Sequence, residues 1–126
     1  MTDPVRIYHN PRCSKSRATL ALLQAAGVTP EVIDYLATPP DAATLADLAV
    51  ALPGGAAQLL RDADAPEGLA GQGEAAILTA IAADPRLLNR PIVITPQGTR
   101  LTRPPETVLD LLSPGQAARA RAALGR

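Results

Sequence analysis

The fold follows from the stretch at residues 5–36, which reads VRIYH-NPRC-SKSRATLALLQAA-GVTP-EVIDYL. Residues 5–9 place a branched apolar side chain at alternate positions, which is typical of a short strand. Across residues 14–26 leucines recur at helical spacing, and Gly27 is a good C-terminal stop, so this segment predicts a helix. Residues 31–36 predict a second strand. A strand–helix–strand unit of this length predicts two parallel strands joined by a right-handed crossover.

The middle of the chain predicts helices, which we expect to form an insertion at about residues 41–88. Asp41 can cap a helix whose leucines recur at helical spacing up to Leu52. Because the helices lie between sheet elements, we expect residues 1–126 to form one domain that carries this insertion. After the helix that Asp41 caps, the predicted elements of the insertion are a short helical turn at 58–61, a loop at 62–73 and a helix at 74–83.

Sheet signals return at residues 91–95 and 99–102, and the turn residues between them predict a hairpin. A helix is expected next, around Val108, and Pro114-Gly115 is expected to end it. The last segment, 113–126, predicts a surface helix or a frayed tail. The order β-α-β, helical insertion, β-β-α is that of a thioredoxin-like α/β fold, with a four-stranded mixed sheet flanked by helices.

Composition excludes several classes of function. The 126 residues include no Phe or Trp and two Tyr, so recognition of nucleic acid by aromatic stacking is nearly excluded. Twelve basic residues balance twelve acidic ones, so no overall field attracts nucleic acid or a membrane surface. One cysteine and one histidine exclude an internal disulfide and argue against a metal centre. A lone thiol and the lack of a signal sequence lead us to expect a cytoplasmic protein.

Cys13 is the candidate nucleophile because it lies where the first strand leads into the first helix. The unpaired N–H groups and the macrodipole at a helix N-terminus stabilise a thiolate, and they also favour a bound oxyanion. Basic residues nearby and protonated His9 would lower the pKa of Cys13 further. The alternative is a buried, inert cysteine, but the polar, turn-forming neighbours are poor core context.

Ser16 completes a C-x-x-S pattern with Cys13. Its hydroxyl can donate a hydrogen bond toward the Cys13 thiolate, or it can stabilise the first helical turn. Since Ser16 is no thiol, a disulfide on Cys13 must be resolved by a thiol from another molecule.

Three arginines stand beside breakers or turns: Arg61, Arg90 and Arg103. Each alone is most simply a solvated surface residue. Arg90 and Arg103, however, flank the two ends of the predicted hairpin, so both can reach one edge of the sheet. In a thioredoxin-like fold a cis-proline before the third strand faces the cysteine loop, and Pro91 occupies that place, so we predict a cis Arg90–Pro91 bond.

Taken together, these motifs resemble the glutaredoxin-coupled arsenate reductases of the ArsC type, as a C-x-x-S variant. The likeness spans residues 5 to about 112. The segments that carry it are HNPRCSKSR at 9–17, YLxTPP at 35–40, LR at 60–61, LNRPIV at 88–93 and GxRLxRPPE at 98–106.

The resemblance implies roles for these residues. Cys13 would be the nucleophile, tuned by His9 and Ser16, and Asn10 and Pro91 would be structural at the site. Arg61, Arg90 and Arg103 would bind the arsenic oxyanion. Arsenate would be reduced to arsenite through a covalent thiol–arsenate adduct, with glutathione as co-substrate, glutaredoxin as partner, and neither metal nor bound cofactor.

Two other classes of function stay open. One is a glutathione-dependent thiol enzyme with another substrate, and the other is a non-catalytic thioredoxin-like regulatory interaction domain. The three arginines favour an oxyanion enzyme over the regulator, because a binding module has no need to bring guanidinium groups to a thiol.

Overall fold

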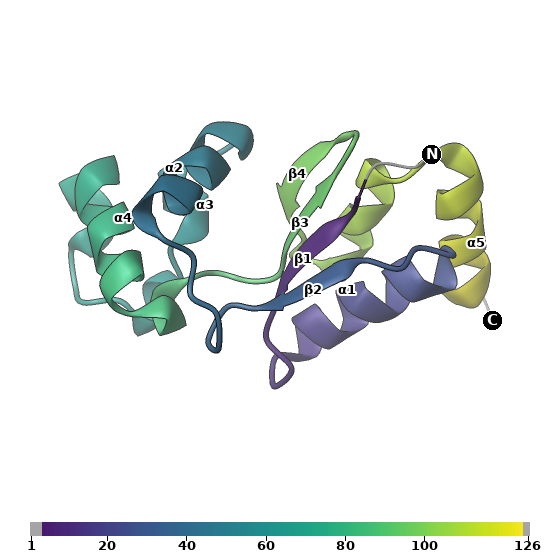
Figure 1. Ribbon diagram of the computed structural model, residues 1–126, viewed down its shortest axis with the longest axis horizontal. Coiled ribbons are helices and arrows are strands. Elements are labelled where there is room, and N and C mark those ends of the chain that lie inside the picture. Colours follow the sequence, from purple (N-terminus) through teal and green to yellow (C-terminus); the bar gives the residue numbers. More distant parts are fainter. Residues whose placement is uncertain (1–3, 125–126) are drawn as a thin grey trace. The chain divides into compact units, whose positions relative to one another are not determined.

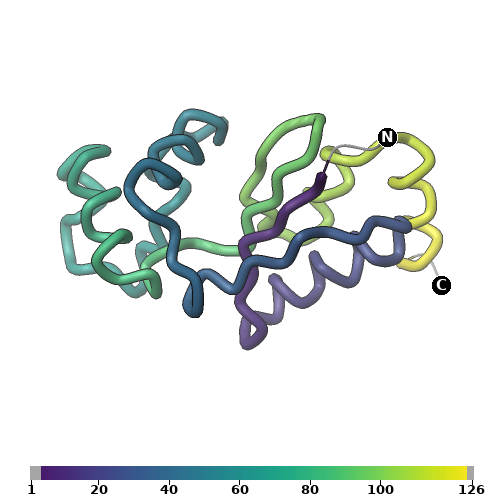
Figure 2. Tube along the Cα trace, in the orientation of Figure 1, coloured from purple at the N-terminus to yellow at the C-terminus, as the bar shows by residue number. Residues whose placement is uncertain are grey.

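The computed structural model describes residues 4–124 (Figure 1). The chain divides into two compact units. Unit 1 contains the chain up to Ile33 and again from Arg90, and unit 2 is Asp34–Asn89. Figure 2 follows the chain as it leaves the sheet after the second strand and returns to it at the third.

Unit 1 is built on a four-stranded mixed sheet, which confirms the predicted fold class. The spatial order is β2-β1-β3-β4, and β3 pairs antiparallel with both β1 and β4. β2 runs beside β1 in the same direction (Figure 1), as a crossover through a helix requires. The strands are β1 (Arg6–His9), β2 (Glu31–Asp34), β3 (Ile92–Thr95) and β4 (Gly98–Leu101).

The register of the sheet brings three chain segments to the same end of the sheet. Tyr8, near the end of β1, pairs with Ile92 at the start of β3. Ile92 pairs in turn with Leu101 at the end of β4. The loop after β1, the residues before β3 and the residues after β4 therefore meet at the same end of the sheet.

Helices α1 (Ser14–Ala25) and η4 (Pro105–Leu111) pack on this sheet, and α5 (Pro114–Leu124) packs on α1 and η4. Ile7 and Val93 of the sheet, Leu23 of α1 and Val108 of η4 are fully buried in one apolar cluster. Gly27 ends α1 as predicted, and its φ of +85° is a left-handed conformation that favours glycine.

Two predictions at the end of the chain needed correction. The helix around Val108 is a 3-10 helix, η4, with prolines before and at its first position. Pro114 does not end a helix but begins α5, because proline is well suited to a first turn whose N–H groups have no partner. Ala117 and Ala120 of α5 are buried, so residues 114–124 form a packed helix; residues 125–126 lie outside the described part.

Unit 2 is helical, as predicted for the insertion. Asp41 caps α2, since its Oδ1 accepts from the Thr44 N–H at 2.8 Å. The predicted turn at 58–61 begins earlier, as α3, and the predicted loop at 62–73 contains two 3-10 turns. The helices of unit 2 are α2 (Ala42–Ala51), α3 (Ala56–Leu59), η1 (Asp62–Asp64), η2 (Leu69–Gln72), α4 (Glu74–Ala83) and η3 (Pro85–Leu87). Whether the two units act as one domain stays a prediction.

Within residues 4–124, none of the helices has the length and apolar character needed to cross a bilayer.

Candidate active site

The loop between β1 and α1 is shaped by Asn10. The Cys13 N–H donates to the Asn10 carbonyl at 3.0 Å, which closes a four-residue turn. Pro11 takes the first central position of this turn, where its fixed φ fits. The Arg12 N–H donates to Asn10 Oδ1 at 2.9 Å. The buried Asn10 side chain thus holds the backbone that presents Cys13.

Ser16 ties this loop to the first turn of α1. The Asn10 N–H donates to Ser16 Oγ at 3.0 Å, and His9 Nδ1 lies 2.9 Å from the same oxygen. His9 and Ser16 are both buried. Of the two roles considered for the Ser16 hydroxyl, these contacts fit the stabilisation of the turn. Any charge effect of His9 on Cys13 stays a prediction.

Cys13 is the N-cap residue of α1, with φ −89° and ψ 122°, and its side chain is partly exposed. Burial raises the pKa of the Cys13 thiol, but the backbone N–H groups of Ser16 and Lys15 lower it, and so does Arg90. The net pKa lies below the ordinary thiol value. Lys15 and Ser16 occupy the second and third helical positions, whose N–H groups a capping side chain normally receives. The Cys13 side chain makes no capping hydrogen bond in the structure, but these N–H groups favour its thiolate over its thiol.

Two of the predicted arginines meet at the sulfur. Arg103 Nη1 donates to Cys13 Sγ at 3.9 Å and to the Arg90 carbonyl at 2.9 Å. The Arg90 side chain lowers the pKa of Cys13 through hydrogen bonding and through its charge. The Arg90–Pro91 bond is cis, as predicted, and Arg103–Pro104 is also cis. This end of the sheet therefore carries one thiol and two guanidinium groups.

Arg61 belongs to unit 2, so its convergence on Cys13 stays a prediction. Within that unit its N–H donates to the Leu87 carbonyl at 2.7 Å. Its guanidinium Nε lies 2.7 Å from Asp64 Oδ2, in an ion pair whose members are 29% and 49% exposed. The side chain is thus held by a carboxylate within its own unit.

Sequence reasoning missed two buried threonines beside the site. Thr19 Oγ1 on α1 lies 3.1 Å from Thr102 Oγ1, which follows β4, and both side chains are fully buried. Thr102 directly precedes Arg103. The available signal was the position of Thr19 three residues after Ser16, on the face of α1 that also carries Leu22 and Leu23.

The site as a whole combines a thiol with hydrogen-bond donors and positive charge. No group of three His, Cys, Asp or Glu side chains among residues 4–124 is arranged to hold a metal ion. What it offers is a partly exposed thiol with a lowered pKa, beside helix N–H groups and two guanidinium forks. Such donors suit the oxygens of a tetrahedral anion.

Comparison with known proteins bears on this arrangement. Residues 8–111 match the model of the ArsC family. The chain is 48% identical over 121 residues to the uncharacterized protein YfgD of Escherichia coli K12, covering 89% of this chain and 99% of that protein. It is 42% identical over 113 residues to an arsenate reductase of Rhizobium meliloti, covering 86% and 81%.

A solved structure is also similar. The arsenate reductase from Vibrio cholerae matches with a TM-score of 0.76 and 37% identity, covering 89% of this chain and all of that chain. The matched region contains Cys13, Arg61, Arg90 and Arg103, that is, every residue of the predicted nucleophile and oxyanion set. On this sequence and structural evidence, the chain belongs to the ArsC family.

Proposed function

We propose that this protein is an arsenate reductase that works through a covalent adduct on Cys13. The observation that carries the proposal is the contact of Arg103 Nη1 with Cys13 Sγ at 3.9 Å, with Arg90 acting on the same sulfur. A purely structural cysteine has no need of two guanidinium groups. The relatives named arsenate reductase supply the substrate class.

Binding comes first. Arsenate is a tetrahedral anion, and guanidinium forks can engage two of its oxygens at a time. Arg90 and Arg103 would hold it against the N-terminus of α1, and Arg61 is proposed as the third anchor. Arg90, which would attract the anion, also lowers the pKa of Cys13 and so favours the thiolate that attacks the substrate.

In the first chemical step the Cys13 thiolate attacks arsenic. A sulfur–arsenic bond forms and one arsenic–oxygen bond breaks; the oxygen takes up a proton and leaves as water. Arsenic is still pentavalent. The guanidinium groups stabilise the charge on the remaining oxygens, as donors of an oxyanion hole do.

The reducing electrons must come from outside, because Cys13 is the single cysteine of the chain. Glutathione displaces a second arsenic oxygen, which leaves as water with the thiol proton. The glutaredoxin thiolate then attacks the glutathione sulfur and forms a disulfide with it. The bond between glutathione sulfur and arsenic breaks, and its electron pair stays on arsenic. Arsenic becomes trivalent, and water cleaves the Cys13–arsenic bond to release arsenite. These thiols imply the reducing cytoplasm as the compartment.

The test is arsenite formation by the purified protein with arsenate, glutathione and glutaredoxin, with each thiol omitted in turn. We expect turnover only when all three are present. A folded protein that makes no arsenite contradicts the assignment. If arsenate nevertheless protects Cys13 against alkylation, the result favours a thiol enzyme for another oxyanion; if it does not, a regulatory domain is favoured.

A further inference from the structure

The buried threonine pair links the helix of the nucleophile to the loops of both arginines. Thr102 Oγ1 donates to the Pro91 carbonyl at 3.4 Å, and the Thr102 N–H donates to the same carbonyl at 3.0 Å. A hydroxyl has one proton to give. Thr19, at 3.1 Å, must therefore donate to Thr102 Oγ1 when Thr102 donates to Pro91. The hydrogen bonds run from α1 through Thr102 to Pro91.

Two members of this hydrogen-bonded series are next in sequence to an arginine of the site. Pro91 follows Arg90 and Thr102 precedes Arg103. Thr19 lies six residues after Cys13, which is about 9 Å along a helix. The Thr19–Thr102 contact thus ties α1 to the Arg103 loop, and the two bonds from Thr102 to Pro91 tie that loop to the Arg90 loop. Both threonine side chains are fully buried.

We propose that Thr19 and Thr102 are positioning residues that hold Arg90 and Arg103 in reach of the Cys13 sulfur. The inference rests on the proposed function for its kinetic consequences but not for its geometry. A buried hydroxyl that only filled space could be replaced by a methyl group without consequence for a sulfur on another element. Here the hydroxyls join elements that are 83 residues apart in the sequence.

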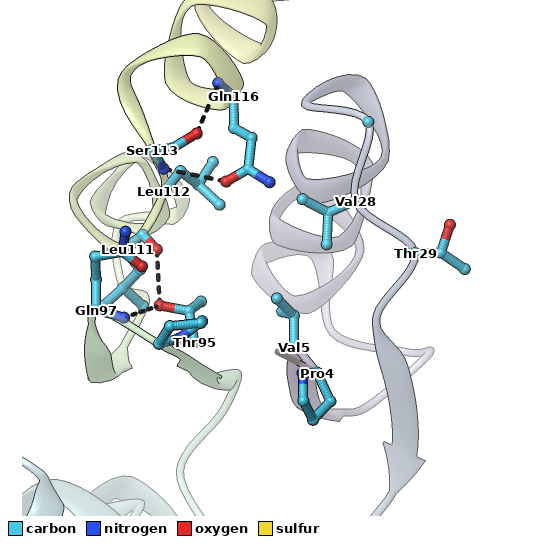
Figure 3. A pocket seen from close by; sticks show the side chains of 12 residues that line it. Pro4, Val5, Val28, Thr29, Thr95, Gln97, Leu111, Leu112, Ser113 and Gln116 are labelled. Atoms are coloured by element: carbon cyan, nitrogen blue, oxygen red, sulfur yellow. Dashed lines mark hydrogen bonds between the residues drawn. The ribbon is translucent and has the colours of Figure 1, made fainter. Parts of the chain in front are cut away.

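The structure supplies a matched control. Thr95 is also a buried threonine of unit 1, and its Oγ1 donates to the Leu111 carbonyl at 2.7 Å. It also accepts from the Gln97 N–H at 3.0 Å. Thr95 lines a groove of about 520 Å³ (Figure 3) at the end of β3 away from Arg90. Thr95→Val therefore removes a comparable buried hydroxyl far from the sulfur.

The experiment measures the rate of Cys13 alkylation by iodoacetamide against pH, without arsenate. The variants are Thr19→Val, Thr102→Val, Thr102→Ser and Thr95→Val, with thermal unfolding recorded for each. Since displaced guanidinium groups stabilise the thiolate less, we expect Thr102→Val to move the midpoint upward and Thr102→Ser to restore it. Thr95→Val is expected to lower stability and leave the midpoint unchanged.

Arsenate kinetics give a second readout. A displacement of about 1 Å at a reacting centre costs on the order of 100-fold in rate, so Thr102→Val is expected to lose between tenfold and 100-fold in kcat/KM. Identical alkylation profiles for Thr102→Val, Thr19→Val and Thr95→Val would overturn the proposal. If Thr102→Val fails to fold, Thr19→Val decides by the same comparison. An inactive wild type refutes the proposed function but leaves the alkylation test in force.

Discussion

Arg103→Ala is expected to reduce the thiolate content of Cys13 about tenfold at a pH well below the midpoint. Arg103 Nη1 lies 3.9 Å from the sulfur. Two unit charges at about 4 Å interact by about 4 kcal/mol at an effective dielectric constant of about 20. Both side chains are only partly exposed, so the screened energy lies between this value and the limit of about 1 kcal/mol for exposed pairs, at about 1–2 kcal/mol. About 1.4 kcal/mol is tenfold in an ionisation equilibrium.

The assay is the alkylation rate of Cys13 at mildly acidic pH, compared with the rate in the denatured protein as the reference for a free thiol. Arg103→Lys is expected to lose less, because it keeps the charge but not the fork. Arg100→Ala is the control. Arg100 lies in β4 and pairs with Val93, one residue further than Leu101 from the end of the sheet that carries Cys13. Equal effects of Arg100→Ala and Arg103→Ala would refute the reasoning.

The remaining predictions concern pH, the third arginine and stability. The alkylation rate of wild-type Cys13 is expected to rise with pH at a midpoint below the usual value of about 8.5, because the lowered pKa keeps the thiolate at lower pH; a midpoint at 8.5 contradicts it. Arg61→Ala should lower the rate of arsenate reduction by about 100-fold, because the anion loses a hydrogen-bond donor. Arg86→Ala breaks another Arg–Asp pair of unit 2 and is the control, with no change in rate expected. Equal rates for the two variants would contradict the role of Arg61. Gly27→Ala should lower the free energy of unfolding by about 1–2 kcal/mol, since φ is +85° and the new Cβ would lie 2.8 Å from Arg119 Nη1; unchanged denaturant unfolding contradicts it.

Much of the local structure could be predicted because local signals decide it. The helix predicted at residues 74–83 is α4, and Asp41 caps α2 through its own side chain. Gly27 ends α1 because few other residues adopt its φ. The cysteine at the start of α1 and the hairpin flanked by arginines also follow from short-range patterns and from the known order of the fold.

The predictions that were wrong concern segments whose structure depends on contacts with distant parts of the sequence. Residues 105–111 form a 3-10 helix packed on α1, and apolar spacing alone did not distinguish it from an α-helix. α5 is weakly apolar, yet Ala117 and Ala120 are buried because they pack against α1 and η4.

The site shows the same division. The lowered pKa of Cys13 could be predicted from its place at a helix N-terminus, whose N–H groups lower it. The sequence left two roles open for the Ser16 hydroxyl, a hydrogen bond toward the Cys13 thiolate or stabilisation of the first helical turn. The structure pairs it with His9 and Asn10. The contact of Thr19 with Thr102 joins residues too distant in sequence for any local pattern to indicate.

In the proposed mechanism the Cys13 thiolate forms the bond to arsenic. The most direct measurement compares arsenite production by the wild type and by Cys13→Ser, with arsenate, glutathione and glutaredoxin supplied to both. A serine hydroxyl is a far weaker nucleophile at neutral pH, and no second thiol exists to replace Cys13. We expect a folded Cys13→Ser protein with no turnover above background. Substantial arsenite production by that variant would contradict it.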